Sequence, residues 1–260
     1  MATIVTGYFQ LERSKASHEI YRGWMKNMLS IKNPMIIFCD SQNIKMIREL
    51  RKENTKIIET KWEDFYSHRY INNFIQHQQL DIEVSRGHNA QLYMIWAEKS
   101  NFLKRAIEMN PFSTDYFLWV DIGCFRRPNT DYLEWPCPKR ISEIPHDKVL
   151  LLSVYPFTPE ELSCSTVEEL PHFQFTNRIG APIFGGGKEI LLEWHTKYYG
   201  MLENFIRMGR FIGKDQSIMN SVYLMNKEMC ELVSWKQPCH DIWFYLQDYL
   251  QRSERFPGEN

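Results

Sequence analysis

A run of apolar residues that ends abruptly in a carboxylate is the feature of this chain that most constrains its fold. Residues 116–120 read Tyr-Phe-Leu-Trp-Val, Asp121 follows them directly, and Gly123 comes two residues later. Five apolar residues are too few for a helix and indicate a strand buried on both faces, as in a parallel sheet covered by helices. Asp121 is therefore expected at the carboxyl end of that strand, where α/β proteins bind ligands.

Asp121 itself has two interpretations. A charge that follows so much buried surface is costly unless a cation, a ribose hydroxyl or a backbone donor meets it. A carboxylate at this place can also cap a turn and bind nothing. The spacing alone leaves both interpretations open.

Strands and helices alternate over the N-terminal part of the chain. The predicted order is strand 3–7, helix 15–29, strand 34–39, helix 43–51 and strand 56–59. In the first helix, Ile20, Trp24 and Met28 recur at i, i+4 and i+8 and form one apolar face. Asp40 or Ser41 can cap the second helix. This order favours right-handed crossovers and a parallel sheet.

The remaining segments are less regular. Residues 61–89 are polar and aromatic, and we expect short helices and loops there, followed by a long helix at 90–109. Residues 128–145 hold four prolines and indicate an extended excursion before a strand at 148–154. Residues 155–178 show no periodicity and are expected to form a lid or an acceptor loop.

These elements predict an α/β fold with a mostly parallel central sheet flanked by helices. A length of 260 residues suffices for one Rossmann-like domain over residues 1–260 with a sizeable core. The formal net charge of −1 gives no electrostatic case for nucleic acid or an anionic membrane.

The same composition predicts a cytoplasmic protein. The chain enters its first predicted strand almost at once, so no signal peptide is expected, and no apolar run is long enough for a transmembrane segment. The six cysteines form no Cys-x-x-Cys pair, which argues against a disulfide framework or a zinc cluster. A reducing compartment fits this pattern best.

Two later segments carry candidate site residues. Gly185, Gly186 and Gly187 follow a short apolar strand and precede a predicted helix, but the spacing and the hydroxyl residue of a P-loop are missing. Close backbone approach to a sugar or to a neighbouring helix is the preferred interpretation over phosphate binding. Asp215 and Gln216 lie on the first turn of another predicted helix, where the macrodipole stabilises a negative charge. Asp215 can equally be an ordinary helix-start residue.

The chain is also rich in aromatic residues, which make up 14% of it and include eight tryptophans. Trp62 and Trp235 lie in polar segments, as expected for side chains that stack on sugar or base rings. Contact with a partner or simple core packing is the alternative.

Several motifs along the chain resemble those of a known family. They are Thr6-Gly7-Tyr8-Phe9, Gly87-His88-Asn89, Trp96, Lys99, Asn110-Pro111-Phe112, the segment from Trp119 to Arg126, Gly185-Gly186 and Asp215-Gln216. On these motifs the chain resembles the HtrL/YibB-type proteins, a bacterial and viral family similar to glycosyltransferases with the A-type nucleotide-sugar (GT-A) fold. The Trp-Val-Asp-x-Gly-x-x-Arg segment at 119–126 is the most specific part of the resemblance. More distantly, the order of parts resembles the glycogenin-like transferases.

This resemblance implies a nucleotide-binding half at residues 1–125 and an acceptor-side half at residues 126–260 of a single GT-A-like domain. The residues implied to bind the donor nucleotide are Thr6, Gly7, Tyr8, Asp40, Lys99, Val120, Asp121 and Gly123, with Lys99 on the diphosphate. The residues implied to face the sugar and the acceptor are Gly185, Gly186, Asp215 and Gln216. Asp121 and Asp215 are the implied catalytic pair.

The chain departs from this pattern at one place that concerns metal binding. Gly123 stands where the Asp-x-Asp motif of such transferases has its second carboxylate. Either Asp121 and the diphosphate oxygens hold a weak Mn²⁺ or Mg²⁺ ion, or cationic side chains replace the ion. The candidate cations are Lys99, Arg126 and Lys214. His240 is a candidate further metal ligand, although a surface role is the simpler interpretation.

The leading expectation is a glycosyltransferase that moves a sugar from a nucleoside-diphosphate sugar, expected to be UDP-linked, to a glycan or other hydroxyl acceptor. The alternative is a catalytically silent module of the same fold that binds a carbohydrate or a protein partner. A phosphatase that uses Asp121 as nucleophile would have its acidic motif on the first strand, and Asp121 comes too late for that.

Overall fold

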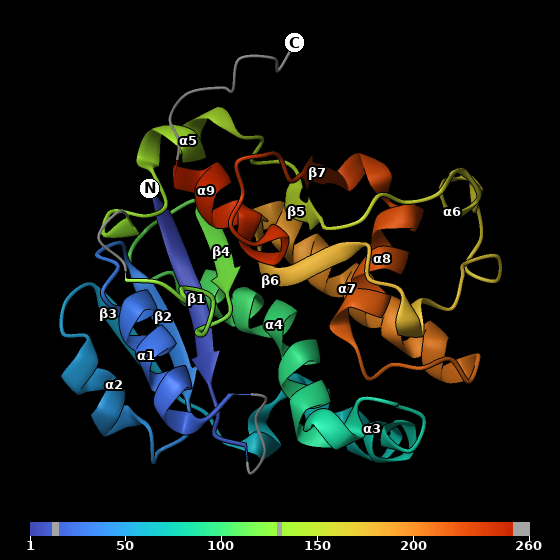
Figure 1. Cartoon of the computed structure of the whole chain (residues 1–260), viewed down its shortest axis with the longest axis horizontal. Coiled ribbons are helices and arrows are strands. Elements are labelled where there is room, and N and C mark those ends of the chain that lie inside the picture. The colour runs from blue at the N-terminus through green and yellow to red at the C-terminus, as the bar shows by residue number, and fades with distance from the viewer. Residues whose placement is uncertain (12–15, 129–131, 252–260) are drawn as a thin grey trace.

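The computed structural model describes residues 1–11, 16–128 and 132–251 (Figure 1). These residues form a seven-stranded sheet in the order β3-β2-β1-β4-β6-β5-β7. The strands are β1 (Ala2–Tyr8), β2 (Met35–Cys39), β3 (Thr55–Glu59), β4 (Tyr116–Val120), β5 (Val149–Ser153), β6 (Ile179–Gly187) and β7 (Cys230–Ser234). The helices are α1 (His18–Leu29), α2 (Ile44–Leu50), α3 (Ile71–Gln78), α4 (Ala90–Met109), α5 (Pro138–Glu143), α6 (Pro159–Ser163), α7 (Lys188–Arg207), α8 (Asp215–Met225) and α9 (Tyr245–Gln251). Among the described strands, β6 alone runs antiparallel to its neighbours.

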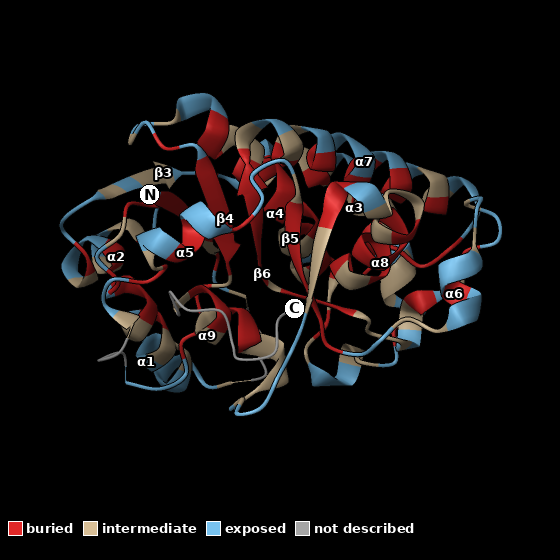
Figure 2. Cartoon of the chain, turned by 90° about the horizontal axis from the view of Figure 1, so that it is seen from above, coloured by how far each residue is buried: buried red, intermediate tan, exposed pale blue. Residues whose placement is uncertain are grey.

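Strands β2, β4 and β5 are buried along their whole length, as their nearly continuous apolar runs predict. In β4, Phe117 and Trp119 face one core, whereas Tyr116, Leu118 and Val120 face the other. Helices α3, α4, α7 and α8 cover the first face, and α1, α2, α5 and α9 cover the second (Figure 2). The prediction of an α/β fold with a mostly parallel sheet flanked by helices is therefore confirmed.

The carboxyl ends of the parallel strands meet at one edge of the sheet, which we call the carboxyl edge. Tyr8 ends β1, Cys39 ends β2, and Asp121 follows β4 directly. The antiparallel strand β6 reaches this edge with its amino end, where the Asp121 N–H donates a hydrogen bond of 2.8 Å to Pro182 O. Asp121 thus occupies the strand-end position predicted from its apolar run.

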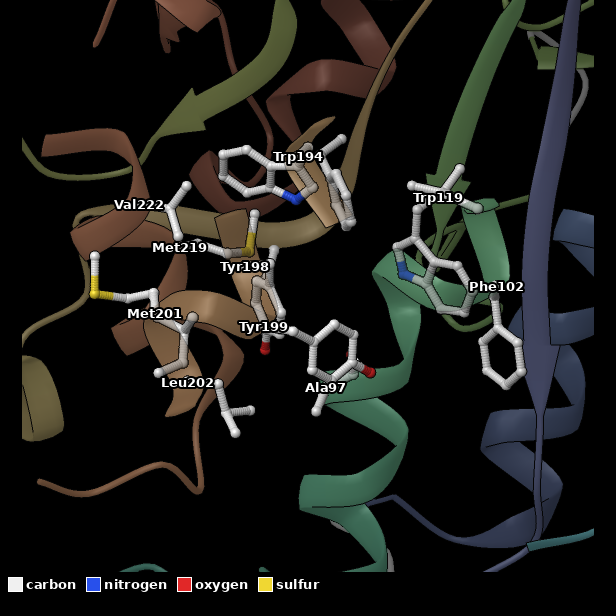
Figure 3. Packing of buried hydrophobic residues seen from close by; sticks show 14 of the residues in the cluster. Ala97, Phe102, Trp119, Trp194, Tyr198, Tyr199, Met201, Leu202, Met219 and Val222 are labelled. Atoms are coloured by element: carbon white, nitrogen blue, oxygen red, sulfur yellow. The ribbon is translucent and has the colours of Figure 1, made fainter. Parts of the chain in front are cut away.

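Helix α4 packs on β4 next to this edge through aromatic rings. The Trp119 and Phe102 rings stack with their centroids 5.8 Å apart and their planes 12° apart (Figure 3). Lys99 lies one helical turn before Phe102 on the same helix. The packing that buries these rings therefore also brings Lys99 against the strand end that carries Asp121.

Most of the aromatic side chains serve the core. Trp119, Trp135 and Trp194 are fully buried, and Figure 3 shows Trp194 packed with residues of α7 and α8. Trp62 is half-buried, and Trp235 is 36% exposed. Core packing, the alternative interpretation, thus explains most of the aromatic content, and Trp62 and Trp235 keep surface for contacts.

The buried face of helix α1 differs from the predicted one. It begins at His18, and the first residue of the predicted helix, Lys15, lies outside the described residues. Its buried residues include Met25 and Met28, whereas Ile20 is 52% exposed. The prediction that Ile20 faces the core is wrong, because only the C-terminal half of α1 packs on the sheet.

The second half of the chain is more regular than its sequence suggests. The predicted extended excursion at 128–145 contains α5, which begins at Pro138, where a missing N–H costs nothing. The unpatterned segment 155–178 contains α6 and a 3₁₀ turn at Phe173–Phe175. Strand β7, which was not predicted, lies at one end of the sheet, and its residues after the first are half-buried or exposed.

The triple glycine is part of a strand and forms no turn. Gly185 pairs with Leu118 and Gly187 pairs with Tyr116, so these glycines run from the middle of β4 to its amino end. A Cβ at Gly185 would overlap the carbonyl oxygen of Phe117. Close backbone approach was the correct reason for the glycines, but the neighbour is β4 rather than a sugar.

Candidate functional site

A buried lysine joins two carboxylates at the carboxyl edge of the sheet. Lys99 Nζ lies 3.0 Å from Asp121 Oδ1 and 2.9 Å from Asp215 Oδ2. The three side chains come from the middle of α4, the end of β4 and the first residue of α8. With one positive and two negative charges, this group carries a formal charge of −1.

Further hydrogen bonds fix this group in place. Lys99 Nζ donates to Ala181 O at 3.2 Å, and Trp119 Nε1 donates to Asp121 Oδ1 at 2.7 Å. The Gln216 N–H donates to Asp215 Oδ1 at 2.9 Å. The side chains of Lys99 and Asp215 are 5% and 6% exposed, whereas that of Asp121 is 33% exposed. Asp121 is therefore the member of the group that a ligand can reach.

The electrostatics keep the lysine charged. Burial lowers the pKa of Lys99, but the ion pairs with Asp121 and Asp215 outweigh burial, and the pKa is raised above its ordinary value. Burial raises the pKa of Asp121 above its ordinary value, although the Lys99 ammonium opposes this shift. Lys99 is thus a permanent cation held between two carboxyl groups.

Two clefts meet at Asp121. The β1 cleft has a volume of about 300 Å³, and its lining includes Tyr8, Tyr21 and Leu92. The α8 cleft has a volume of about 420 Å³, and its lining includes Asn177 and Gln216. The residues that line both clefts are His88, Trp96, Lys99, Asp121 and Arg126.

A third hollow, the β2 cleft, adjoins the β1 cleft. It has a volume of about 770 Å³, and Asp40 and Trp62 contribute to its lining. It shares Gln10, Leu11 and His18 with the β1 cleft. The three clefts together follow the carboxyl edge from β2 to α8.

Most of the predicted site residues come together at this edge. The predicted residues that line the β1 cleft are Gly7, Tyr8, Lys99 and Asp121, and Asp40 lines the β2 cleft. The predicted residues that line the α8 cleft are Lys99, Asp121, Asp215, Gln216, Lys214 and Arg126. Lys99 departs from its implied role, because its buried ammonium is already engaged by ion pairs with Asp121 and Asp215 and by a hydrogen bond to Ala181 O.

Other predicted residues lie away from the clefts. Thr6 and Val120 are fully buried in their strands and line neither the β1 cleft nor the α8 cleft. Gly123 is buried too, and a Cβ there would lie 3.1 Å from the Tyr21 ring. Gly185 and Gly186 pair with Leu118 and Phe117 inside the sheet and line neither the β1 cleft nor the α8 cleft, so the prediction that they face a sugar is wrong. The antiparallel direction of β6 explains this error, because Ala181 O meets Lys99 and Pro182 O meets the Asp121 N–H instead.

His240, the candidate metal ligand, is exposed at another place. It lines a hollow of about 360 Å³ together with Arg127 and Asp248, and Asp121 does not line that hollow. The proposed pairing of His240 with Asp121 on one metal ion is therefore not supported by their positions.

A histidine and an arginine complete the walls of both clefts. His88 Nδ1 lies 2.7 Å from Asp81 Oδ2, and both side chains are almost fully buried. The Arg126 guanidinium lies 4.6 Å from the Trp24 ring and 4.5 Å from the Phe244 ring. Both belong to motifs of the family resemblance, which marked the segments without assigning His88 a role. The partner Asp81 lies seven residues earlier in a loop, where no sequence pattern indicated it.

Within the described part of the chain, one group of three potential metal ligands lies close together: Asp81, Glu83 and His88. Each already has another partner. Asp81 accepts hydrogen bonds from His88 and Tyr93, and Glu83 forms an ion pair of 2.5 Å with Lys214. A metal ion would have to displace the Lys214 ammonium, so we assign this group to a hydrogen-bonded network rather than to a metal centre.

Among the described helices, none is long and apolar enough to cross a membrane.

Comparison with known proteins places the chain in a family. A search of curated proteins finds no match. A family model described as "Bacterial protein of unknown function (HtrL_YibB)" matches residues 1–245. The chain therefore belongs to the HtrL_YibB family.

Proposed function

We propose that this chain is a glycosyltransferase that moves a sugar from a nucleoside-diphosphate sugar, with UDP as the expected nucleotide, to a glycan or other hydroxyl acceptor. One observation carries the proposal: Asp121, with Lys99 behind it, forms part of the wall between two clefts at the carboxyl edge. Two substrates that exchange a group can meet at such a wall, each from its own cleft. The motif resemblance to nucleotide-sugar transferases points to the same chemistry.

The β1 and β2 clefts suit a nucleoside. Tyr8 and Tyr21 stack with their centroids 6.0 Å apart in the β1 cleft, and Trp62 lines the β2 cleft beside Asp40. An aromatic face can stack on a base or a ribose, and a carboxylate can accept a hydrogen bond from the N–H of a uracil. Asp40 and Trp62 therefore offer the two kinds of contact that a base requires.

Arg126 is the cation best placed for the diphosphate. It lines both clefts, and the rings of Trp24 and Phe244 hold its guanidinium from two sides. A guanidinium can bind two phosphate oxygens at once and stays charged at all physiological pH values. We therefore transfer the role implied for Lys99 to Arg126.

Lys99 instead occupies the position between the two carboxylates where a divalent ion would otherwise bind. Its ammonium bridges Asp121 and Asp215, and Gly123 stands where a second motif carboxylate would be needed for a metal. An Mn²⁺ or Mg²⁺ ion would have to be held by Asp121 and the diphosphate together, because hard cations need several oxygen ligands. A metal requirement, if present, would thus depend on bound nucleotide.

In the proposed reaction the acceptor hydroxyl attacks the anomeric carbon from the α8 cleft. The bond from that carbon to the diphosphate oxygen breaks, and the nucleoside diphosphate leaves with the bonding electrons. Asp215 and Gln216 line this cleft at the first turn of α8. They would bind and orient the transferred sugar.

Binding and turnover test the proposal in two steps. Calorimetry and thermal shift with UDP, GDP and CMP come first, because a ligand at 100 times its dissociation constant stabilises the protein by about 2.7 kcal/mol. No heat and no thermal shift at millimolar nucleotide would overturn the proposal. The second step measures hydrolysis and transfer from UDP-sugars.

Two substitutions separate the roles of the carboxylates. Asp121→Ala should abolish donor binding, whereas Asp215→Asn should leave nucleotide binding nearly intact and lower kcat by about 10²-fold, because the transferred sugar is no longer oriented. Asp115→Asn is the matched control, because Asp115 is 78% exposed and pairs with Lys188 at the opposite edge of the sheet. Equal nucleotide affinity of Asp121→Ala and the wild type would contradict the assignment.

One observation favours the silent binding module as the second candidate. Both carboxylates of the predicted catalytic pair are ion-paired with Lys99, so neither is a free base. Tight binding of UDP-sugars without hydrolysis or transfer to any offered saccharide would select this candidate.

A further inference from the structure

His88 is a buried histidine whose orientation is fixed by one carboxylate. The residue is 3% exposed, and its Nδ1 lies 2.7 Å from Asp81 Oδ2. A buried carboxylate that accepts from Nδ1–H holds the imidazole in one tautomer, with the lone pair on Nε2. The same arrangement orients the histidine in hydrolases that use it as a base.

Asp81 is itself held as a carboxylate. It accepts hydrogen bonds from Tyr93 OH at 2.7 Å and from the Glu83 N–H at 2.9 Å. Burial raises the pKa of Asp81, but the hydrogen bonds from Glu83, Tyr93 and His88 outweigh burial, and the pKa is lowered below its ordinary value. Asp81 therefore stays ionised and able to stabilise a protonated His88.

The other ring nitrogen is left without a partner. His88 Nε2 is buried and makes no hydrogen bond with any described residue. An unpaired buried acceptor costs about 1–3 kcal/mol, and folded proteins keep few of them. His88 also lines both the β1 cleft and the α8 cleft, together with Asp121.

We propose that His88 is the catalytic base of the transfer reaction, an inference that rests on the proposed function. Its Nε2 accepts the proton of the acceptor hydroxyl as that oxygen bonds to the anomeric carbon of the donor. The bond between this carbon and the diphosphate oxygen breaks, and the nucleoside diphosphate leaves with the electron pair. Asp81 stabilises the imidazolium until the proton passes to solvent.

The surrounding charges favour this assignment over the carboxylates. Lys99 already forms ion pairs with both Asp121 and Asp215, so each carboxylate is engaged by a protein cation before a substrate binds. Nε2 of His88 has neither a hydrogen-bond donor nor an ion-pair partner among the described residues, whereas Asp215 Oδ2 lies 2.9 Å from the Lys99 ammonium. Because Nε2 is buried, its contact with the acceptor hydroxyl requires the wall of the cleft to shift as the substrate binds; catalytic hydrogen bonds often form fully only in the complex.

The tautomer is tested first, without any substrate. Nitrogen-15 NMR of the histidine rings in the full-length protein should show His88 protonated at Nδ1 and unprotonated at Nε2 when neutral. His88→Gln assigns its signals by their loss, and Asp81→Asn should release the tautomer preference. A neutral His88 that carries its proton on Nε2 would overturn the proposal.

Turnover is tested next. His88→Gln should bind UDP as the wild type does and lower kcat for transfer by about 10²–10⁴-fold. His172→Gln is the matched control, because His172 is exposed and lines neither cleft. Thermal unfolding of each variant verifies that it is folded, and Asp81→Asn, which keeps the imidazole, should give an intermediate loss.

The outcomes distinguish a failure of the proposed transferase function from a failure of the assignment of His88 as base. If the wild type binds no nucleotide, the proposed function is overturned, and the base assignment is overturned with it. If the wild type binds UDP and transfers sugar while folded His88→Gln keeps full kcat, only the base assignment is wrong.

Discussion

At the scale of single residues, Lys99 is the group on which the site depends most. It pairs with two carboxylates from different elements and is itself almost fully buried. Removal of one partner from a buried ion pair costs about 3–5 kcal/mol, because the remaining charge stays desolvated. We therefore expect Lys99→Met to lower the free energy of unfolding by about that amount, as measured by urea denaturation.

Lys104→Met is the control for this prediction. Lys104 lies on the same helix and pairs with Glu108, but both side chains are more than a third exposed. Exposed pairs contribute about 0–1 kcal/mol, so this variant should unfold almost as the wild type does. Equal unfolding midpoints for the two variants would show that Lys99 has no special structural role.

His195 predicts how stability changes with pH. Burial lowers the pKa of His195 to about 4, and its ring packs edge-on against the rings of both Tyr66 and Tyr199. Below the ordinary histidine pKa of about 6.5 this side chain binds a proton in the unfolded chain but not in the folded chain. The free energy of unfolding therefore decreases as the pH is lowered. Between pH 7 and pH 5 this residue alone should remove about 2 kcal/mol of the free energy of unfolding.

The measurement compares urea denaturation of the wild type and His195→Gln at both pH values. The variant should lose less stability on acidification, whereas His172→Gln, with its exposed imidazole, should lose as much as the wild type. A wild type and a His195→Gln variant with the same pH dependence would refute the lowered pKa.

At the scale of elements, β6 sets the geometry of the site because it runs against its neighbours. Gly185 faces the backbone of β4 so closely that a Cβ would meet the Phe117 carbonyl oxygen. Gly185→Ala should therefore lower the free energy of unfolding by about 3 kcal/mol or more. Gly200→Ala in α7 should raise it by about 0.5–1 kcal/mol, because no atom lies within 4 Å of that Cβ and alanine favours helix.

Thermal unfolding of both glycine variants checks that Gly185→Ala lowers the melting temperature and that Gly200→Ala raises it. If Gly185→Ala melted at the wild-type temperature, the close packing of β6 on β4 would be wrong.

Elements with a strong local signal were predictable, and those without it were not. The apolar run before Asp121 predicted β4, and the length of the apolar pattern predicted α4 at Ala90–Met109. Strand direction has no local signal, so the antiparallel course of β6 and the resulting placement of Gly185 escaped prediction. Strand β7 escaped prediction although Cys230, Leu232 and Val233 are apolar, because no glycine or proline separates it in the sequence from helix α8.

At the scale of the whole molecule, the site combines side chains that lie far apart in sequence. Lys99, Asp121 and Asp215 were each predicted as site residues, because each ends or begins an element or belongs to a family motif. Their mutual ion pairing was not predicted, since it depends on how α4 and α8 pack on the sheet. The Asp81–His88 pair was missed for the same reason, as Asp81 lies in a loop without a pattern.

The position of β6 between β4 and β5 has a consequence for the order of protein synthesis. When only the residues up to about Arg126 have left the ribosome, β4 has a partner on one side and an uncovered edge on the other. Lys99 and Asp121 are then present, but Ala181 and Asp215 are still to be translated. A nascent chain thus contains four strands before the site can form. The second carboxylate that pairs with Lys99 is present only after α8 has been translated.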